Sequence, residues 1–186
     1  MRIIRGKYQR RVIHVPVGLP VRPTTDMAKE SLFNILENDT DLEGLKVLDL
    51  FAGTGNISYE FCSRGCASVL AVDNHPKCTK FIEETAKLLD MQPLRVIRSD
   101  VFKFLGNLNT SYDLIFADPP YDMDAALYHA LVALIFDRKL LADDGALVVE
   151  HSKKIDFMEH PHLFDLRRYG KVHFSFFSPE IDNTLA

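Results

Sequence analysis

One stretch constrains the fold of this chain more than any other: residues 46–56, which read KVLDLFAGTGN. Its first five residues form an apolar run interrupted by Asp49, which is typical of a buried parallel strand whose end faces a ligand. Gly53 and Gly55 predict a tight turn that lets the backbone approach a bound group. Residues 56–65 continue at helical spacing. Strand, Gly-x-Gly turn and helix together predict the first unit of a nucleotide-type site in an α/β fold.

The residues around this turn indicate which cofactor it would bind. A dinucleotide site has a third glycine where this chain has Ser58,. Asp49 lies four residues before Gly53, where a carboxylate would repel a pyrophosphate but suit an ammonium and a sulfonium group. S-adenosylmethionine carries both groups, so the loop favours that cofactor and argues against a dehydrogenase. The alternative is an ordinary turn between a strand and a helix.

Acidic residues follow two further predicted strands. Residues 68–72 lead into Asp73, at the distance from Asp49 that a βα crossover requires. An acid at this place hydrogen-bonds ribose hydroxyls, and a helix-capping role for Asp73 is an alternative that is compatible with the first. Residues 95–98 predict a third strand, which is followed by Asp100. Three strands that each end in an acid predict an adenosine site without a phosphate.

A second motif, the tetrapeptide DPPY at residues 118–121, directly follows a strand predicted for residues 112–117. The two prolines remove N–H donors and leave carbonyl acceptors, while the tyrosine adds an aromatic face. Acceptors beside a ring suit a planar group with an NH₂, because the acceptors hold the amine hydrogens while the ring stacks on the base. A plain proline-rich turn is the alternative for the motif taken alone. The predicted catalytic residues are Asp118, Pro119, Pro120 and Tyr121.

Charge is unevenly distributed along the chain, whose net charge is −4. Residues 1–25 hold six basic residues and no acid, a pattern that indicates a polyanionic partner. A solvated arm that only improves solubility is the alternative. Two β-prone segments on either side of Gly6 predict a basic N-terminal β-hairpin over residues 1–24, and residues 25–186 then form a single domain. The predicted RNA-binding residues are Arg2, Arg5, Lys7, Arg10, Arg11 and Arg22.

Composition sets broad limits on the kind of protein. A chain of 186 residues with 47% hydrophobic content can bury the core of one domain without a partner,, so we expect a monomer. It has no apolar run long enough for a membrane span and no export signal, and its three cysteines fit reduced thiols in the cytoplasm,. The pairs Cys62/Cys66 and His160/His162 lack further ligands at suitable spacing. No metal is therefore expected.

Taken together, residues 47–56, the acids Asp73 and Asp100, and DPPY resemble the motifs of class I S-adenosylmethionine-dependent methyltransferases that act on exocyclic or amide nitrogen. More narrowly, the chain resembles the bacterial RsmD family, which methylates the N2 amine of one guanine in small-subunit (16S) ribosomal RNA. The segments that carry the narrower resemblance are RGK at 5–7, RPT at 22–24, FNIL at 33–36, SRG at 63–65 and YG at 169–170.

The resemblance implies a Rossmann-like fold, with a seven-stranded, mostly parallel sheet, helices on both faces and an antiparallel last strand. It implies S-adenosylmethionine as cofactor and ribosomal RNA, within an assembling small subunit or free, as partner. It also implies donor contacts along the loop, at the ribose and at the adenine. The predicted cofactor-binding residues are Asp49, Phe51, Ala52, Gly53, Thr54, Gly55, Asp73, Asn74, Asp100 and Val101.

Motifs of the DPPY type leave other functions open. Methyltransferases of DNA or RNA adenine and of protein glutamine amides use similar motifs, and an inactive RNA-binding protein could keep the fold. The basic arm argues against a protein substrate, and the lack of a separate recognition domain argues against sequence-specific DNA. The preference for guanine over adenine rests on the family resemblance. For the reaction we expect direct in-line transfer, with Asp118 and the Pro119 carbonyl orienting the amine.

Overall fold

The computed structural model describes residues 1–19 and 26–179, and the chain forms two compact units. Unit 1 comprises residues 1–101 and unit 2 residues 102–186. Arg22 and the RPT segment lie outside the described residues. No helix in the described ranges is both long and apolar enough to cross a membrane.

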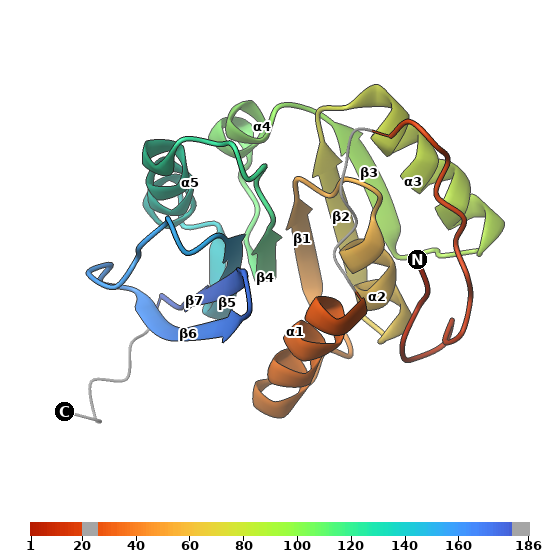
Figure 1. Cartoon of the computed structure of the whole chain (residues 1–186), viewed down its shortest axis with the longest axis horizontal. Coiled ribbons are helices and arrows are strands. Elements are labelled where there is room, and N and C mark those ends of the chain that lie inside the picture. Colours follow the sequence, from red (N-terminus) through yellow and green to blue (C-terminus); the bar gives the residue numbers. More distant parts are fainter. Residues whose placement is uncertain (20–25, 180–186) are drawn as a thin grey trace. The chain divides into compact units, whose positions relative to one another are not determined.

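Unit 1 contains three parallel strands, in the order β3-β2-β1, and three helices (Figure 1). β1 and β2 are buried along almost their whole length, so both of their faces are covered,. Among the helices, α2 packs on β1 and β2, and α3 packs on β2 and β3. The elements of this unit are α1 (Asp26–Asp39), β1 (Lys46–Leu50), α2 (Asn56–Ser63), β2 (Ser68–Asp73), α3 (Pro76–Leu88) and β3 (Leu94–Arg98).

The N-terminal arm, residues 1–19, is fastened to the rest of unit 1. Arg2 and Val12 form an isolated antiparallel bridge, and backbone hydrogen bonds on both sides extend it: Ile3 N donates to Arg11 O at 3.0 Å, and Ile13 N donates to Met1 O at 2.9 Å. Residues 5–10 form turns. The hairpin over residues 1–24, and the domain boundary placed after it, therefore remain predictions.

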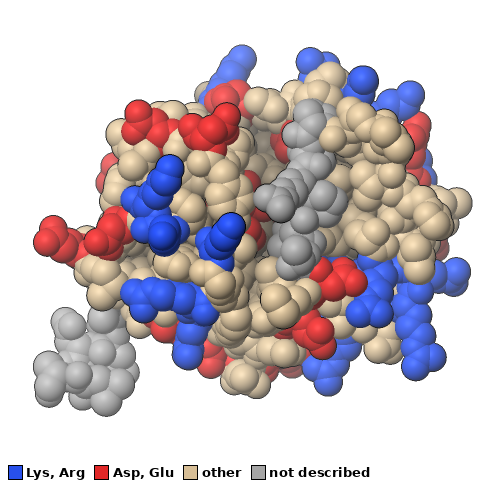
Figure 2. Space-filling model, viewed as in Figure 1, with Lys and Arg blue, Asp and Glu red and all other residues tan. Residues whose placement is uncertain are grey.

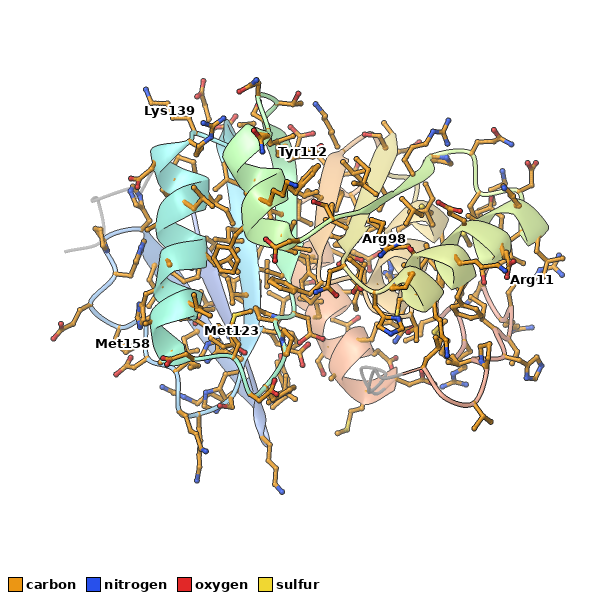
Figure 3. The ribbon with its side chains drawn as sticks, turned by 90° about the horizontal axis from the view of Figure 1, so that it is seen from above. Arg11, Arg98, Tyr112, Met123, Lys139 and Met158 are labelled. Carbon is orange, nitrogen blue, oxygen red and sulfur yellow. The ribbon has the colours of Figure 1, made fainter. Side chains whose placement is uncertain are left out.

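Unit 2 contains four strands in the order β4-β5-β7-β6 (Figure 1). β4 and β5 are parallel, whereas β7 runs antiparallel to both β5 and β6. The antiparallel last strand is thus confirmed. Figure 3 shows the unit from above, with α5 running from the Met123 side to the Lys139 side. The elements are α4 (Val101–Asn107), β4 (Tyr112–Ala117), α5 (Ala125–Asp137), β5 (Leu141–His151), β6 (Leu163–Tyr169) and β7 (Val172–Phe177).

Two local patterns in unit 2 differ from their sequence-based interpretation. Residues 143–145, which read as a turn before a strand at 146–150, belong to the longer strand β5, whose pairing shifts between Tyr112↔Leu141 and Leu114↔Ala146. A bulge of this kind lets turn-forming residues protrude without ending the strand. Residues 153–160, where the sequence favours a short helix, form two turns joined by an irregular segment, and the burial of Ile155 and Phe157, two residues apart, does not follow helical spacing.

Candidate active site

The loop after β1 has the conformation that its glycines predict. Gly53 and Gly55 both adopt positive φ, 54° and 75°. A Cβ on Gly55 would lie 2.9 Å from Ile82 Cγ1 and from the Tyr59 ring, so a side chain there would displace these neighbours and adopt a strained backbone conformation. Phe51 also has a positive φ of 59°, which is costly for a bulky residue and is typical of functional turns. The loop is therefore held in a strained, defined shape.

Asp49 and Ser58, which separately argue against a dinucleotide, form one contact. The Ser58 hydroxyl donates a hydrogen bond to Asp49 Oδ2 beneath the loop. Asp49 is 1% exposed, and burial raises the pKa of its carboxyl to about 7, with nearby Asp73 adding to the rise. A cationic ligand nearby would favour the carboxylate form.

Asp73 connects the end of β2 to the loop. Its Oδ2 accepts a hydrogen bond from Gly53 N at 2.9 Å, and its Oδ1 accepts one from His75 N at 2.7 Å. The residue that caps α3 is His75, whose Nδ1 accepts from Lys77 N, so the capping alternative for Asp73 is wrong. Each carboxylate oxygen keeps acceptor capacity, which leaves Asp73 able to bind ribose hydroxyls.

The other predicted cofactor-binding residues differ in exposure. Thr54 is buried, and its hydroxyl contacts Met1 Sδ at 3.6 Å, so its side chain faces the arm. Asn74 and Asp100 are exposed, whereas Val101 is buried at the start of α4. Of the predicted set, Asp73 accepts a hydrogen bond from Gly53 N, and its charge adds to the raised pKa of Asp49. The donor contacts of the whole set stay predictions.

In unit 2, the carbonyls of DPPY are less free than the sequence indicates. The hydroxyl of buried Tyr128, on α5, lies 3.3 Å from both the Pro119 and the Pro120 carbonyl oxygens. Pro120 O also accepts from Met123 N at 2.9 Å. A carbonyl has two lone pairs, so Pro119 can still accept one more hydrogen bond. The sequence analysis did not identify Tyr128, because it lies eight and nine residues beyond the two prolines, within α5.

The tyrosine of DPPY leads to a second residue that the sequence analysis did not identify. Tyr121 is 54% exposed, and its hydroxyl donates to Glu150 Oε1 at 3.0 Å. Glu150 is 3% exposed, near the end of β5, and burial raises the pKa of its carboxyl to about 7. The signal was present in the sequence, since Glu150 is one more acid near the end of a strand.

His151 and the three cysteines lie in the interior of the protein. His151 is buried, with its Nε2 2.8 Å from Ser175 Oγ and its Nδ1 2.9 Å from Ser152 O. The three cysteines are buried free thiols, and burial raises their pKa values. No group of three or more His, Cys, Asp or Glu side chains within residues 1–19 and 26–179 could hold a metal ion.

The basic residues of the arm fall into two groups. Arg2 pairs with Asp26 at 2.9 Å and Arg5 with Glu37 at 2.6 Å. Lys7, Arg10 and Arg11 are exposed, Arg11 lies at the outer edge of unit 1 (Figure 3), and Figure 2 shows basic side chains along that edge. The second group therefore offers the more available charge for a polyanion.

Comparison with known proteins gives a matching family model and two consistent relatives. A family model described as conserved hypothetical protein 95 matches residues 1–178. The putative rRNA methyltransferase YlbH of Bacillus subtilis (strain 168) is 34% identical over 163 residues, which cover 86% of this chain and 86% of that protein. The ribosomal RNA small subunit methyltransferase D of Escherichia coli (strain K12) is 31% identical over 150 residues, 81% of this chain and 74% of the relative.

A solved structure supports the same assignment. The putative methyltransferase yhhF from Escherichia coli has a TM-score of 0.83 with this chain at 28% identity, covering 95% of this chain and 96% of that one. Together with the seven strands of the described residues, mostly parallel, and the antiparallel β7, this similarity confirms the Rossmann-like α/β fold that the sequence predicts.

Proposed function

Because this chain belongs to the RsmD family of methyltransferases, we propose that it transfers a methyl group from S-adenosylmethionine to the N2 amine of a guanine in 16S ribosomal RNA. The observation that carries the proposal is the acceptor-rich end of β4. There, Asp118 precedes a Pro119 carbonyl fixed by Tyr128, and a half-exposed aromatic ring follows at Tyr121. Such a group of acceptors fits an amine on a flat base.

The loop of unit 1 suits the cofactor. A side chain at Gly55 would displace Ile82 and Tyr59, and Asp73 holds Gly53 while keeping acceptor capacity for ribose hydroxyls. Asp49 supplies a buried carboxyl beneath the loop, which favours a ligand with positive charge over one with phosphates. S-adenosylmethionine supplies the methyl group on its positively charged sulfur. The two units therefore divide the work, with donor binding in unit 1 and base binding in unit 2.

The residues of unit 2 prepare the amine for attack. An exocyclic amine shares its lone pair with the ring and is a poor nucleophile. Asp118 and the Pro119 carbonyl accept its two hydrogens and turn the lone pair toward the methyl carbon. Tyr121 stacks on the base, which requires a nucleotide turned out of its helix. The methylated nitrogen is acidic, and in this proposal the carboxylate of Asp118 also takes the proton that it releases, although orientation of the amine is its larger role.

Methyl transfer from labelled S-adenosylmethionine tests this proposal. Small-subunit particles and naked rRNA that lack native methylations are the substrates, followed by digestion to nucleosides. We expect label in N2-methylguanosine. Label in N6-methyladenosine would contradict the choice of base, and an absence of label in RNA despite donor binding would contradict the substrate class.

Asp118→Ala tests the roles of the residues. Loss of one group that stabilises developing charge lowers turnover by about 10²- to 10³-fold, and donor binding should stay intact because the cofactor loop is in unit 1. Asp143→Ala is the matched control, since Asp143 is an exposed aspartate of the same unit and lies near the start of β5, far along the strand from Glu150. Near-normal turnover in Asp118→Ala would overturn the assigned role.

A further inference from the structure

Glu150 contains a buried acceptor that no other described residue uses. Its Oε1 accepts the Tyr121 hydroxyl, but its Oε2 is buried without a hydrogen-bond partner in residues 1–19 and 26–179. Buried polar atoms are nearly always paired, and an exception calls for an explanation. The explanation we develop is that the partner belongs to the substrate.

The strand register places this acceptor beside the DPPY motif. Ala117 of β4 pairs with Val149 of β5, so the residues that follow, Asp118 and Glu150, are neighbours across strands that lie about 4.8 Å apart. Burial raises the pKa of Tyr128 to about 12, and the charges of Asp118 and Glu150 add to the rise. Both acids therefore lie near the Tyr128 hydroxyl. Two carboxyl groups therefore stand next to each other where the base is proposed to bind.

The other acceptors near Tyr121 already have partners. The Pro120 carbonyl accepts from Met123 N, and the Pro119 and Pro120 carbonyls share the single hydrogen of the Tyr128 hydroxyl, which lies 3.3 Å from each. One remaining acceptance at Pro119 together with Asp118 accounts for the two hydrogens of the amine. A further N–H of the base would meet Glu150.

Resting on the proposed function, we infer that Glu150 accepts the N1–H of the target guanine and so selects guanine over other bases. In guanine, N1–H and the N2 amine are adjacent donors on one edge of the ring. Two neighbouring carboxyl groups match this pair, with Asp118 at the amine and Glu150 at N1–H. Adenine has an unprotonated N1, whose lone pair the Glu150 carboxylate would repel.

The comparison of guanine with 2-aminopurine, made in the wild type and in Glu150→Gln, tests this contact. 2-Aminopurine keeps the reacting N2 amine but lacks both the N1 proton and the O6 oxygen, so the part of the loss that Glu150→Gln removes reports on Glu150. The substrates are two RNAs that differ at the methylated position alone, once labelling has identified it. A site built to bind an N–H rejects an analogue that lacks it by roughly 10⁴-fold, so we expect wild-type kcat/KM to fall by about 10²- to 10⁴-fold on 2-aminopurine.

Two variants separate reading of the base from support of Tyr121. In Glu150→Gln, the amide can donate to an unprotonated N1, so the guanine preference should shrink to about tenfold or less. Tyr121→Phe removes the hydroxyl that contacts Glu150 but keeps the ring and the carboxyl group. It should therefore retain the preference for guanine, even if both rates fall.

Each result has a distinct meaning. Efficient methylation of guanine by the wild type with no loss on 2-aminopurine overturns the role of Glu150 but leaves the proposed function standing. Equal losses on both bases in Glu150→Gln and in Tyr121→Phe assign Glu150 to the support of Tyr121 and overturn base selection. Failure of the wild type to methylate guanine overturns the proposed function itself. The wild-type comparison does not depend on whether either variant folds.

Discussion

Glu60 in unit 1 and Glu150 in unit 2 are both buried glutamates, yet their surroundings are opposite. Glu60 is fully buried and accepts hydrogen bonds from the backbone N–H groups of Ile4 and Arg5, both at 3.0 Å, and from the Arg64 guanidinium. Glu150 accepts one hydrogen bond and keeps an oxygen without a partner among the described residues. Burial alone therefore does not mark a functional acid. The proposed role of Glu150 rests on its unmet hydrogen-bonding capacity together with its place beside DPPY.

The partners of Glu60 explain why its role is structural. Buried Lys29 lies 3.3 Å from Glu60 and also donates to Arg2 O at 2.6 Å and to Asn56 Oδ1 at 2.8 Å. Burial lowers the pKa of Lys29, and the charge of Glu60 opposes that shift. This network joins the N-terminal arm to α1 and to the first residue of α2. The loop after β1 ends one residue earlier, at Gly55, so the network also anchors that loop.

The largest expected effect in this comparison is on stability in unit 1. Glu60→Gln removes the charge that compensates buried Lys29 and Arg64, and breaking one partner of a buried pair costs about 3–5 kcal/mol. We expect the urea midpoint to fall accordingly. Exposed Glu43 provides the matched control, Glu43→Gln, with little change. A stability loss below 1 kcal/mol in Glu60→Gln would mean that Lys29 and Arg64 do not depend on the charge of Glu60.

The next effect concerns the pH dependence of activity in unit 2. Since burial raises the Glu150 pKa to about 7, the acceptor form is lost below that pH, and turnover of guanine should fall about tenfold per pH unit there. The facing groups are Tyr121, Tyr128 and Asp118, and both tyrosine pKa values are raised further above this range.

The pH profile is measured at saturating donor, because the pKa of Asp49 is also raised to about 7 and could alter donor binding. Glu150→Gln should remove the acid limb of the profile. A limb that persists unchanged in that variant would assign the titration to another group.

A smaller effect distinguishes the two glutamates by stability. The Glu150 pKa is raised in the folded state, so its contribution to stability is fully present below the unfolded pKa and is lost as pH rises through about 7,. At pH 8, Glu150→Gln should therefore stay within about 1 kcal/mol of wild type or exceed it, unlike Glu60→Gln. Thermal unfolding at pH 5 and pH 8 measures the difference. A large loss at pH 8 would make Glu150 structural.

The smallest effects are expected on the surface of the arm. Replacing Lys7, Arg10 or Arg11 with Ala should weaken RNA binding and reduce the salt dependence by about one unit of slope each. Arg2→Ala and Arg5→Ala remove exposed ion pairs worth about 0–1 kcal/mol,. Fluorescence titrations with 16S rRNA at several salt concentrations compare the two groups. Equal salt slopes in all five variants would show that ion pairing does not divide the arm.

Much of the sheet could be predicted because its signals are local. The apolar run of β1 and the alternation of strands with helices determine those elements from adjacent residues, and residues 46–50 and 112–117 have the predicted bounds. The bounds of β5 were wrong, because a bulge keeps residues 143–145 in the strand. The bulge depends on how β5 pairs with β4, and residues next to it in the sequence do not indicate that pairing.

The chemistry of the site was predicted in the same way, from residues that are close in sequence. The acids near strand ends, the Gly-x-Gly turn and DPPY determine by themselves what kinds of group the molecule offers to a ligand. Which of those groups are already hydrogen-bonded depends on residues from other elements of the fold. Tyr128 reaches the prolyl carbonyls from α5, and Ser58 reaches Asp49 from α2.

By itself, the sequence determined the fold class and the two motifs, because strand and turn propensities act over a few residues. Only the tertiary structure decided that Glu60 is satisfied and that Glu150 is not. Both are acids in apolar surroundings along the chain, and three of the donors of Glu60 are distant in sequence: Lys29 is 31 positions away, and Ile4 and Arg5 are more than 50 positions away. Whether a buried acceptor is free depends on donors that folding brings to it from distant parts of the chain.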